Sequence, residues 1–459
     1  MGATCRGDAV PTGADRRGVF AWMLFDWANQ PFQTLIVTFV FAPWFVAEVV
    51  GDPARGQALW GAAAAIAGVC VAVLAPVLGA VADRTGARKP WVLAFSVPYL
   101  LGCVGLWLAT PAMPDPTVVL VCYALAFIGS EFGQVFINAM LPSLAPRAEI
   151  GRISGSGWAL GYLGGVVSLL IVLALLAPAP GSTLTLLGAP PILGLDPGQG
   201  EPARATGPFA AIWYVVFALP MFLWTPDAPG RPLRGAVRAG LADLRATIAT
   251  ARARRDLLLF LLASMVYRDA LVGLFTFGGI YAAGVLGWGM FELGLFGIVA
   301  AGVGAAGAWI GGRADHAYGP RAVIVASIWA LIGLCVLVVL TTRESVLLLP
   351  VPPGSRIPDL VFFAAGGLLG ATSGALQAAS RTLLVHQAEG VMQPGQAFGL
   401  FALSGKATAF LAPALIAAVT AATGSQRLGL SPVILLFLVG LVLLYGVKTT
   451  TEQHRGQAA

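Results

Sequence analysis

The segment GAVADRTGARKP (residues 79–90) lies between two long apolar runs and combines two glycines with a compact group of charges. Gly79 lets a neighbouring helix approach closely, and Gly86 permits a sharp reversal of the chain. Asp83 can accept hydrogen bonds from the backbone N–H groups of a helix N-terminus, or pair with an arginine such as Arg88. The segment therefore predicts a tight turn that holds one end of a helical bundle closed.

A second version of this pattern occurs later in the chain, as GGRADHAYGPR (residues 311–321). Asp315 takes the place of Asp83, and one extra residue precedes Gly319. Each copy lies between the second and third apolar runs of its half of the chain. One copy would be a weak signal, but two copies at equivalent places predict a protein built from two similar halves.

The composition indicates that a lipid bilayer is the solvent for most of the chain. Of 459 residues, 58% are hydrophobic and only 10% are charged, whereas soluble domains carry about 25% charged residues. A soluble chain with this composition could not cover its surface with polar groups. The net charge of +6 is dispersed over short loops, which is typical of membrane topology and argues against nucleic acid as a partner.

Several classes of function find no support in the sequence. The five cysteines include no CxxC pair, and the three histidines are scattered, so we expect no disulfide framework, metal site or cofactor. No Walker-type, HExxH or GxSxG string is present, so we expect no ATP hydrolysis and no catalytic residues. The polar N-terminus and long first apolar run predict that no signal peptide is cleaved.

Apolar runs of about 20 residues, the length that spans a bilayer, predict twelve membrane helices. The fold class is therefore an all-α integral membrane protein with two bundles of six helices. The predicted spans are 20–40, 60–81, 91–110, 117–140, 153–176, 209–224, 257–285, 291–311, 322–340, 360–380, 397–421 and 432–447.

These spans divide the chain into five parts. The parts are a tail (1–19), an N-terminal bundle (20–226), a basic linker (227–256), a C-terminal bundle (257–447) and a second tail (448–459). With the N-terminus inside, 20 lysines and arginines lie on the cytoplasmic side and 5 on the other, which predicts that both termini are cytoplasmic. The basic linker is either an amphipathic helix over about 233–251 on the cytoplasmic leaflet or a solvated connection.

Five ionisable side chains lie inside the predicted spans, where each costs about 2.5–3.5 kcal/mol at a helix centre. They are candidates for binding substrate or a coupling proton: Asp26, Glu131, Arg268, Asp269 and Lys406. One arrangement pairs Lys406 with Asp269 or Glu131 and leaves Arg268 for a substrate carboxylate. Together the five sum to −1, so one carboxylate can hold a proton. The alternative is that buried ion pairs only hold the helices together.

A second set of residues lies at the cytoplasmic ends of the predicted helices and is assigned to gating. Its members are Asp83, Arg84, Arg88, Asp315, Asn138 and Arg381. Asn138 and Arg381 either gate or anchor their helices. Trp158, Tyr162 and Tyr267 either line a cavity or pack between helices.

Two further motifs point to a family. FDWANQPF (residues 25–32) resembles the opening of the branch of the major facilitator superfamily that includes the vacuolar amino-acid effluxers of autophagy. NAMLP (138–142), followed by GRISGSGWALGYLGG (151–165), resembles the same branch between its fourth and fifth helices. Gln30 and Pro31 depart from the usual small residue at those positions, and Pro31 is expected to kink the first helix.

The resemblance implies alternating access around a central cavity, by a monomer in the bacterial inner membrane. The expected function is secondary transport of a small polar solute. The resemblance implies amino acids as the cargo, and the unpaired carboxylate among the five intramembrane charges suggests a proton as the coupling ion. A cation-coupled sugar symporter is an alternative, because the sequence RKPW (88–91) also resembles the glycoside–pentoside–hexuronide branch. A non-transporting receptor or assembly factor on a transporter scaffold is an alternative of another class.

Overall fold

The computed structural model describes residues 15–178, 182–230, 232, 235–286, 288 and 290–448. Twelve helices within these residues are long and apolar enough to cross a membrane, as the sequence predicted. Together they form an all-α, multi-pass membrane fold. The described residues contain a single short sheet, in which Ser345 pairs with Pro350 and Val346 with Leu349.

The first six spans form one bundle, and several of them combine more than one helical segment. They are α1 (Arg16–Pro31) with η1 (Phe32–Phe39), α2 (Phe41–Trp44) and η2 (Phe45–Val49); α3 (Pro53–Thr85); α4 (Lys89–Gly105) with η3 (Leu106–Leu108); α5 (Thr117–Leu144); α6 (Ile150–Ile171), after η4 (Arg147–Glu149) and before η5 (Val172–Leu176); and α8 (Thr206–Trp224) after α7 (Glu201–Arg204). Two short turns, η6 (Ile192–Gly194) and η7 (Pro197–Gln199), lie between the fifth and sixth spans.

The last six spans form the other bundle. They are α10 (Arg255–Leu286); α11 (Met290–Tyr318); α12 (Pro320–Val339); α13 (Ile357–Ala388); α14 (Pro394–Ala407) with α15 (Leu411–Thr423); and α17 (Ser431–Tyr445) after α16 (Gln426–Gly429). The strands β1 (Ser345–Val346) and β2 (Leu349–Pro350) form a hairpin between α12 and α13.

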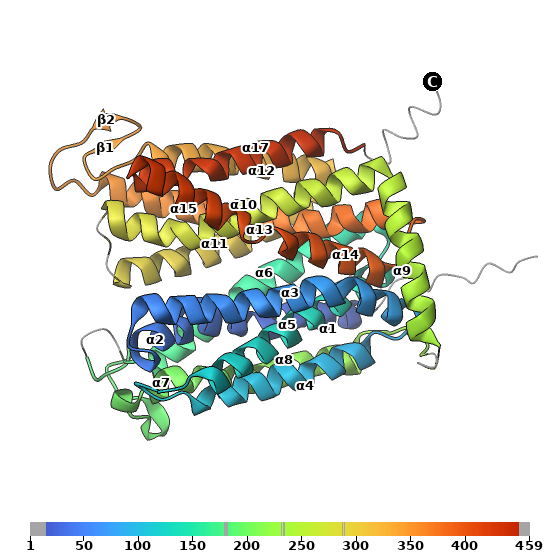
Figure 1. Cartoon of the computed structure of the whole chain (residues 1–459), viewed down its shortest axis with the longest axis horizontal. Coiled ribbons are helices and arrows are strands. Elements are labelled where there is room, and N and C mark those ends of the chain that lie inside the picture. The colour runs from blue at the N-terminus through green and yellow to red at the C-terminus, as the bar shows by residue number, and fades with distance from the viewer. Residues whose placement is uncertain are drawn as a thin grey trace, which may run out of the picture.

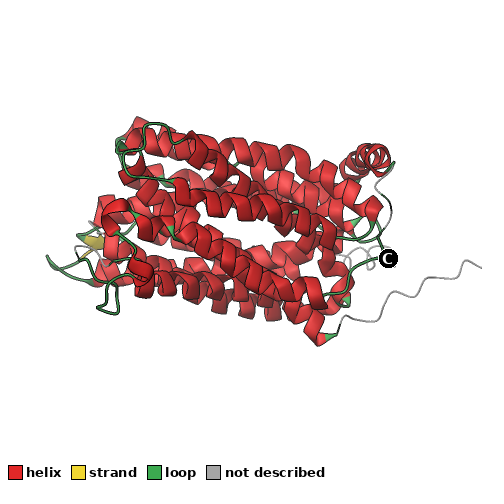
Figure 2. Cartoon of the chain, turned by 90° about the horizontal axis from the view of Figure 1, so that it is seen from below, coloured by secondary structure: helices red, strands yellow, loops and turns green. Residues whose placement is uncertain are grey.

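The two bundles lie side by side, with their helices roughly parallel (Figures 1 and 2). The helix α9 (Ala236–Ala253) crosses the bundle at the end where α1 begins and α17 finishes (Figure 1). We call this the linker end, and the opposite end, where β1 and β2 lie, the hairpin end. The linker thus contains a helix close to the expected range 233–251, and its place on the membrane surface stays a prediction.

The first span is longer than predicted and changes its helical type after Pro31. The span runs from Arg16 to Val49, beyond both ends of the predicted range 20–40, and Pro31 is followed by the π-helix η1. Proline has no backbone N–H, so the carbonyl of Trp27 loses its helical donor. The indole N–H of Trp213 on α8 donates to that carbonyl instead, at 3.1 Å. Pro31 therefore leaves α1 continuous up to η1 and ties it to α8.

The eleventh span is broken, which the sequence analysis did not predict. The helix α14 ends at Ala407 and α15 begins at Leu411, with a turn at 408–410 between them. Pro413 supplies the physical reason. Its missing N–H removes the helical hydrogen bond to the carbonyl of Ala409, and its ring clashes with that carbonyl in an unbroken helix.

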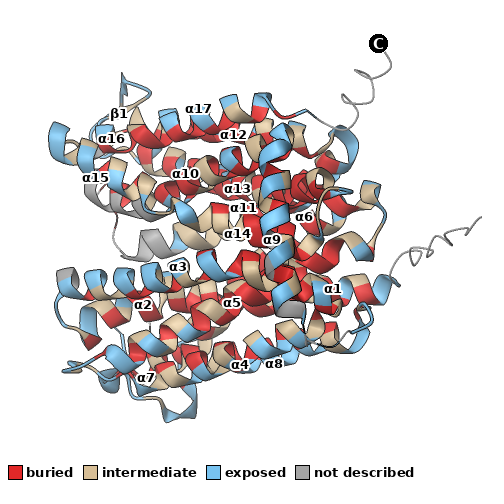
Figure 3. Cartoon of the chain, turned by 45° about the vertical axis from the view of Figure 1, so that its right-hand side comes forward, coloured by how far each residue is buried: buried red, intermediate tan, exposed pale blue. Residues whose placement is uncertain are grey.

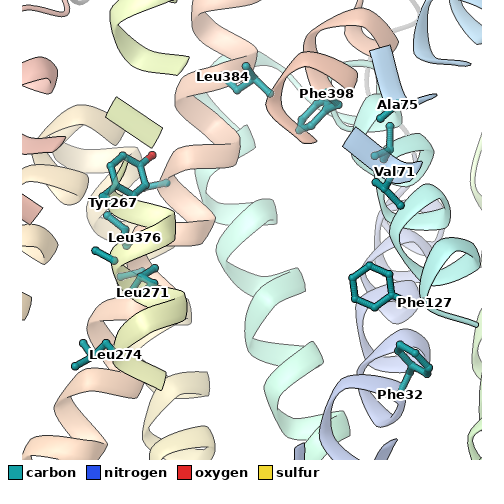
Figure 4. Packing of buried hydrophobic residues seen from close by; sticks show 14 of the residues in the cluster. Phe32, Val71, Ala75, Phe127, Tyr267, Leu271, Leu274, Leu376, Leu384 and Phe398 are labelled. Atoms are coloured by element: carbon teal, nitrogen blue, oxygen red, sulfur yellow. The ribbon is translucent and has the colours of Figure 1, made fainter. Parts of the chain in front are cut away.

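The bundles contact each other through α3 with α14 and through α6 with α11, and glycines allow the closest approaches. A β-carbon on Gly79 would lie 2.2 Å from the carbonyl oxygen of Gly395, and one on Gly155 would lie 2.6 Å from Cα of Gly312. Buried residues concentrate around these contacts near the linker end (Figure 3). Figure 4 shows Phe398 of α14 beside Ala75 of α3. The linker end is therefore closed by backbone-to-backbone packing.

Candidate functional site

The first glycine–aspartate turn joins the two bundles at the linker end. Asp83, at the end of α3, accepts hydrogen bonds from the backbone N–H groups of Gly395 (2.9 Å) and Gln396 (2.8 Å) at the start of α14. The Arg88 guanidinium pairs with the same carboxylate and also donates to the carbonyl of Ala82. A carboxylate at a helix N-terminus satisfies free N–H groups and interacts favourably with the helix dipole. The sequence left two contacts open for Asp83, a helix N-terminus and an arginine. The structure shows that Asp83 makes both.

The second turn occupies the related position between α11 and α6. Asp315 is 4% exposed, and a β-carbon on Gly151 at the start of α6 would lie 2.5 Å from its carboxyl carbon. Its neighbour His316 contacts the carbonyl of Ala148 through Nδ1 at 2.5 Å. Each aspartate of the repeated turn therefore lies against a glycine at the beginning of a helix in the opposite bundle.

The third linker-end contact involves α9. Arg84 of α3 forms a two-pronged ion pair with Asp243 of α9, and the hydrogen bonds from Arg84 lower the pKa of that carboxyl. Thr247 of α9 donates to Oε1 of Gln396 on α14 at 2.5 Å. A cavity of about 1010 Å³ lies beside these residues and is lined by α3, α9 and the segment that leads into α14. The helix α9 therefore contacts both bundles.

Asp26 of α1 and Arg381 of α13 form a buried ion pair between the bundles, with 3.3 Å from Oδ2 to Nη2. Their side chains are 10% and 4% exposed. The Gln134 amide donates to the other oxygen of Asp26 at 2.8 Å and to Asn138 at 3.2 Å. The Arg381 guanidinium also lies 5.5 Å from the ring centroids of two tryptophans, Trp22 and Trp158.

A second ion pair crosses between the bundles deeper in the protein. The Lys406 ammonium of α14 donates to Oε1 of Glu131 on α5 at 3.0 Å, and both side chains are 23% exposed. Glu131 lies 13 residues before the end of α5, which corresponds to about 20 Å from the linker end at 1.5 Å per residue. Lys406 also lies 4.8 Å from the ring centroid of Phe127. Both side chains of this pair are therefore only partly buried.

Arg268 of α10 lies at a similar depth, but no carboxylate among the described residues forms an ion pair with it. It donates to the carbonyl of Phe401 at 2.9 Å and stacks at 4.3 Å from the ring centroid of the same residue. A β-carbon on Gly405 would lie 2.4 Å from its Nη1, so only glycine leaves room for the guanidinium there. Lys406 belongs to α14, and Arg268 of α10 packs against the same helix. Glu131 is the acidic neighbour of both cations.

Asp269, the next residue on α10, faces a different feature. Its Oδ2 accepts a hydrogen bond from the backbone N–H of Ala412 at 3.0 Å, in the first turn of α15. Its Oδ1 is buried and has no hydrogen-bond partner among the described residues. Asp269 therefore lies at the break between α14 and α15 and is not a partner of Lys406, one of the two pairings that the sequence left open.

Polar residues of α5 that the sequence analysis passed over belong to the same site. Gln134 contacts both Asp26 and Asn138, and Ser130 donates to Oδ1 of Asn29 at 3.0 Å. Glu131, Gln134 and Asn138 are spaced i, i+3 and i+7, which places them on one face of a helix. This spacing is visible in the sequence and could have predicted that the three side chains share a face. Of the aromatic candidates, Tyr267 packs between helices, where its hydroxyl contacts Ser380 at 2.7 Å.

No group of three or more histidine, cysteine, aspartate or glutamate side chains gathers within the described residues in a way that suits a metal ion. The central charges instead form two cross-bundle ion pairs, an arginine that has no ion-pair partner among the described residues, and one buried carboxylate at a helix break.

Residues 46–457 match the family model for proteins like the vacuole effluxer Atg22. The chain belongs to this Atg22-like family.

Two relatives agree with this assignment, one over nearly the whole chain and one over about a third of it. The YxiO protein of Bacillus subtilis, described as an uncharacterized MFS-type transporter, is 24% identical and covers 95% of this chain and 96% of its own length. Autophagy-related protein 22 of Yarrowia lipolytica is 25% identical over 34% of this chain and 28% of its own length. The family assignment and the fold make the protein a secondary transporter of the major facilitator superfamily.

A solved structure supports the fold independently of sequence. The E. coli fucose:proton symporter FucP superposes with a TM-score of 0.68 at 14% identity, covering 95% of this chain and 98% of that one. At this identity the likeness shows the fold alone. The Atg22-like protein therefore shares the fold of this transporter, and its two bundles agree with the two similar halves that the repeated turn predicted.

Proposed function

We propose that this Atg22-like protein moves a small amphoteric solute, such as a neutral amino acid, by alternating access between its two bundles. The observation that carries the proposal is the group formed by Glu131, Lys406 and Arg268 halfway across the bundle. It contains one carboxylate and two cations, it is partly exposed, and it lies where α5, α10 and α14 meet. The resemblance to vacuolar amino-acid effluxers favours the same cargo.

The chemistry of the group matches both ends of an amino acid. Arg268 has no carboxylate partner among the described residues, and a guanidinium binds a carboxylate through two parallel hydrogen bonds. Glu131 can exchange the Lys406 ammonium for the amino group of a substrate, because the two cations are chemically alike. Lys406 is then released to share the substrate carboxylate with Arg268. A solute that carries both charges therefore replaces an internal ion pair without leaving a buried charge unpaired.

Asp26 is the proposed site for the coupling proton. Its ion pair with Arg381 joins the bundles, so adding a proton to Asp26 weakens a contact that holds the linker end closed. Asp83, Arg84, Arg88, Asp315 and Asn138 then act with Arg381 as the gating residues of that end. Glycine contacts such as Gly155 against Gly312 must separate during the same motion.

We infer that the protein is a monomer in the bacterial plasma membrane, with the linker end in the cytoplasm. The ratio of 20 to 5 basic residues supports this orientation. Five arginines of the linker lie in or beside α9 and would face the anionic inner leaflet: Arg238, Arg245, Arg252, Arg254 and Arg255.

Transport into proteoliposomes tests the proposal. Purified protein is assayed with a panel of labelled neutral amino acids and sugars, with and without an imposed proton gradient. Uptake of an amino acid that Glu131→Gln and Arg268→Gln both reduce by about tenfold or more, equivalent to about 1.4 kcal/mol or more each, supports the proposal. Uptake of sugars alone supports a sugar symporter, and binding without transport of any compound supports a receptor on a transporter scaffold.

A further inference from the structure

The broken helix between α14 and α15 contains a set of buried oxygen atoms that the transport site described above does not use. Asp269 is 2% exposed, and its Oδ1 has no hydrogen-bond partner among the described residues. The hydroxyl of Thr408, the first residue of the break, is likewise buried without a partner. Pro413 deprives the carbonyl of Ala409 of its helical donor. The break therefore contains a hydroxyl and a carbonyl oxygen, and the Asp269 carboxylate of α10 reaches the same segment through its contact with Ala412.

We propose that this break is a binding site for a monovalent metal cation, with sodium as the best-fitting ion. Asp269 supplies the carboxylate, Thr408 the hydroxyl and Ala409 a backbone carbonyl. These are the hard oxygen ligands that alkali-metal ions take, and discontinuous helices are where membrane transporters bind sodium. The last turn of α14 adds the negative end of its helix dipole.

Charge balance favours a cation at this place. A buried carboxylate without a compensating charge costs several kcal/mol, and no ion pair of Asp269 occurs among the described residues. The two nearest cations in the sequence are engaged elsewhere. Arg268 donates to the Phe401 carbonyl and Lys406 donates to Glu131. The single hydrogen bond from Ala412 leaves the other oxygen of Asp269 free for a metal ion.

A bound proton would neutralise Asp269 too, but it would satisfy fewer of the oxygens at the break. A protonated Asp269 has a single O–H, which can donate to the Thr408 hydroxyl or to the Ala409 carbonyl but not to both. A metal ion bound at the break would be able to take several oxygens as ligands at once. The presence of more than one acceptor at the break, beside the unpartnered Oδ1 of Asp269, is therefore the reason to prefer sodium over a proton.

The position of the site connects it to transport. Asp269 follows Arg268 directly on α10, and Thr408 lies two residues after Lys406, so the metal site shares both helices with the proposed substrate group. An ion at the break would hold α14, α15 and α10 in one arrangement. This step rests on the proposed function, because it makes sodium a second coupling ion alongside the proton proposed at Asp26. Binding of the ion itself does not depend on any transported solute.

Direct binding of radioactive sodium to the purified, full-length protein at neutral pH tests the site. Wild type should bind sodium saturably, with choline as the non-binding control ion. Asp269→Asn should abolish binding. Thr408→Val, which keeps the side-chain shape, should weaken it about fivefold to tenfold, as expected for the loss of one polar contact worth about 1 kcal/mol. Ser373→Ala, which removes another buried hydroxyl without a hydrogen-bond partner among the described residues, should bind sodium like wild type.

The outcomes separate this proposal from the transport proposal. The metal site is overturned if wild type shows no saturable sodium binding. It is also overturned if Asp269→Asn and Thr408→Val bind sodium as well as wild type does. A protonated Asp269 is then the explanation. Amino-acid uptake is measured on the same preparations with and without sodium. Sodium binding without amino-acid uptake retains the site and overturns the proposed cargo.

Discussion

Asp26 and Arg381, which are 355 positions apart, form the most deeply buried ion pair that crosses between the two bundles, at 3.3 Å. Each residue also has neutral partners. Gln134 donates to the carboxylate, while Trp22 and Trp158 flank the guanidinium. A buried charge without its partner is costly, so neither residue can leave the pair without being neutralised or finding another partner. Under the proposed function, separation of the bundles therefore requires that Asp26 be neutralised or that both residues find new partners.

The first prediction concerns the stability of this pair. Arg381→Met should destabilise the protein by about 3–5 kcal/mol, because it leaves the Asp26 carboxylate buried with Gln134 as its main donor. Adding Asp26→Asn should recover most of that loss, because the second change removes the unpaired charge. Thermal unfolding in detergent measures both variants. Additive losses in the double variant would mean that the two side chains do not interact.

A matched exposed pair provides the control. Arg343 and Asp359 lie near the hairpin end with side chains 48% and 21% exposed. Exposed ion pairs contribute about 0–1 kcal/mol, so Arg343→Gln should change the unfolding temperature much less than Arg381→Met.

The second prediction concerns closure of the linker end. A β-carbon on Gly155 would lie 2.5 Å from the Ala308 carbonyl oxygen and 2.6 Å from Cα of Gly312, so Gly155→Ala cannot fit while α6 and α11 are in contact. The variant should favour a state that is open at the linker end. Labelling of a cysteine introduced at Ala145, which lines the linker-end cavity, should become several times faster. Gly68→Ala is the control, because no atom lies within 4 Å of its β-carbon position.

The third prediction separates the two contacts of the repeated turn. Asp83→Asn removes the charge that faces the backbone N–H groups of Gly395 and Gln396, so it should also speed labelling at the linker end. Arg84→Gln removes an ion pair whose arginine side chain is 50% exposed, so it should have little effect on the same measurement. Equal effects of the two variants would show that α9, and not the start of α14, holds this end closed.

The architecture was readable from the sequence because it depends on signals that are repeated or long. Twelve apolar runs gave twelve spans, and the two copies of the glycine–aspartate turn gave the two bundles. Asp83 was expected at a helix N-terminus or beside an arginine, and it makes both contacts. These features are local or periodic, so they can be predicted without knowing which helices contact each other.

The pairing of charges was less readable because it depends on contacts between distant segments. The sequence left Lys406 with two possible partners, and the structure selects Glu131. Arg381 was placed at a helix end because it closes an apolar run, yet α13 continues to Ala388 and buries it against Asp26. The break after Ala407 was missed because apolar residues continue on both sides, although Pro413 marked it. A hydropathy count does not detect the backbone hydrogen bond that a proline cannot donate.

The last prediction tests how the protein tolerates Pro31 within its first span. Trp213→Phe removes the indole N–H that donates to the Trp27 carbonyl, which Pro31 leaves without a helical donor. Leaving a buried carbonyl unsatisfied costs about 1–3 kcal/mol, so the variant should unfold at a lower temperature than wild type.

Pro31→Ala restores a backbone N–H four residues after Trp27. The double variant should therefore be more stable than Trp213→Phe alone, whereas Trp329→Phe, whose indole N–H meets only the exposed Tyr445 hydroxyl, should change little with or without Pro31→Ala. If Pro31→Ala fails to compensate Trp213→Phe, the indole stabilises the bundle through its ring contacts with Trp27 and Phe217 instead of through this hydrogen bond.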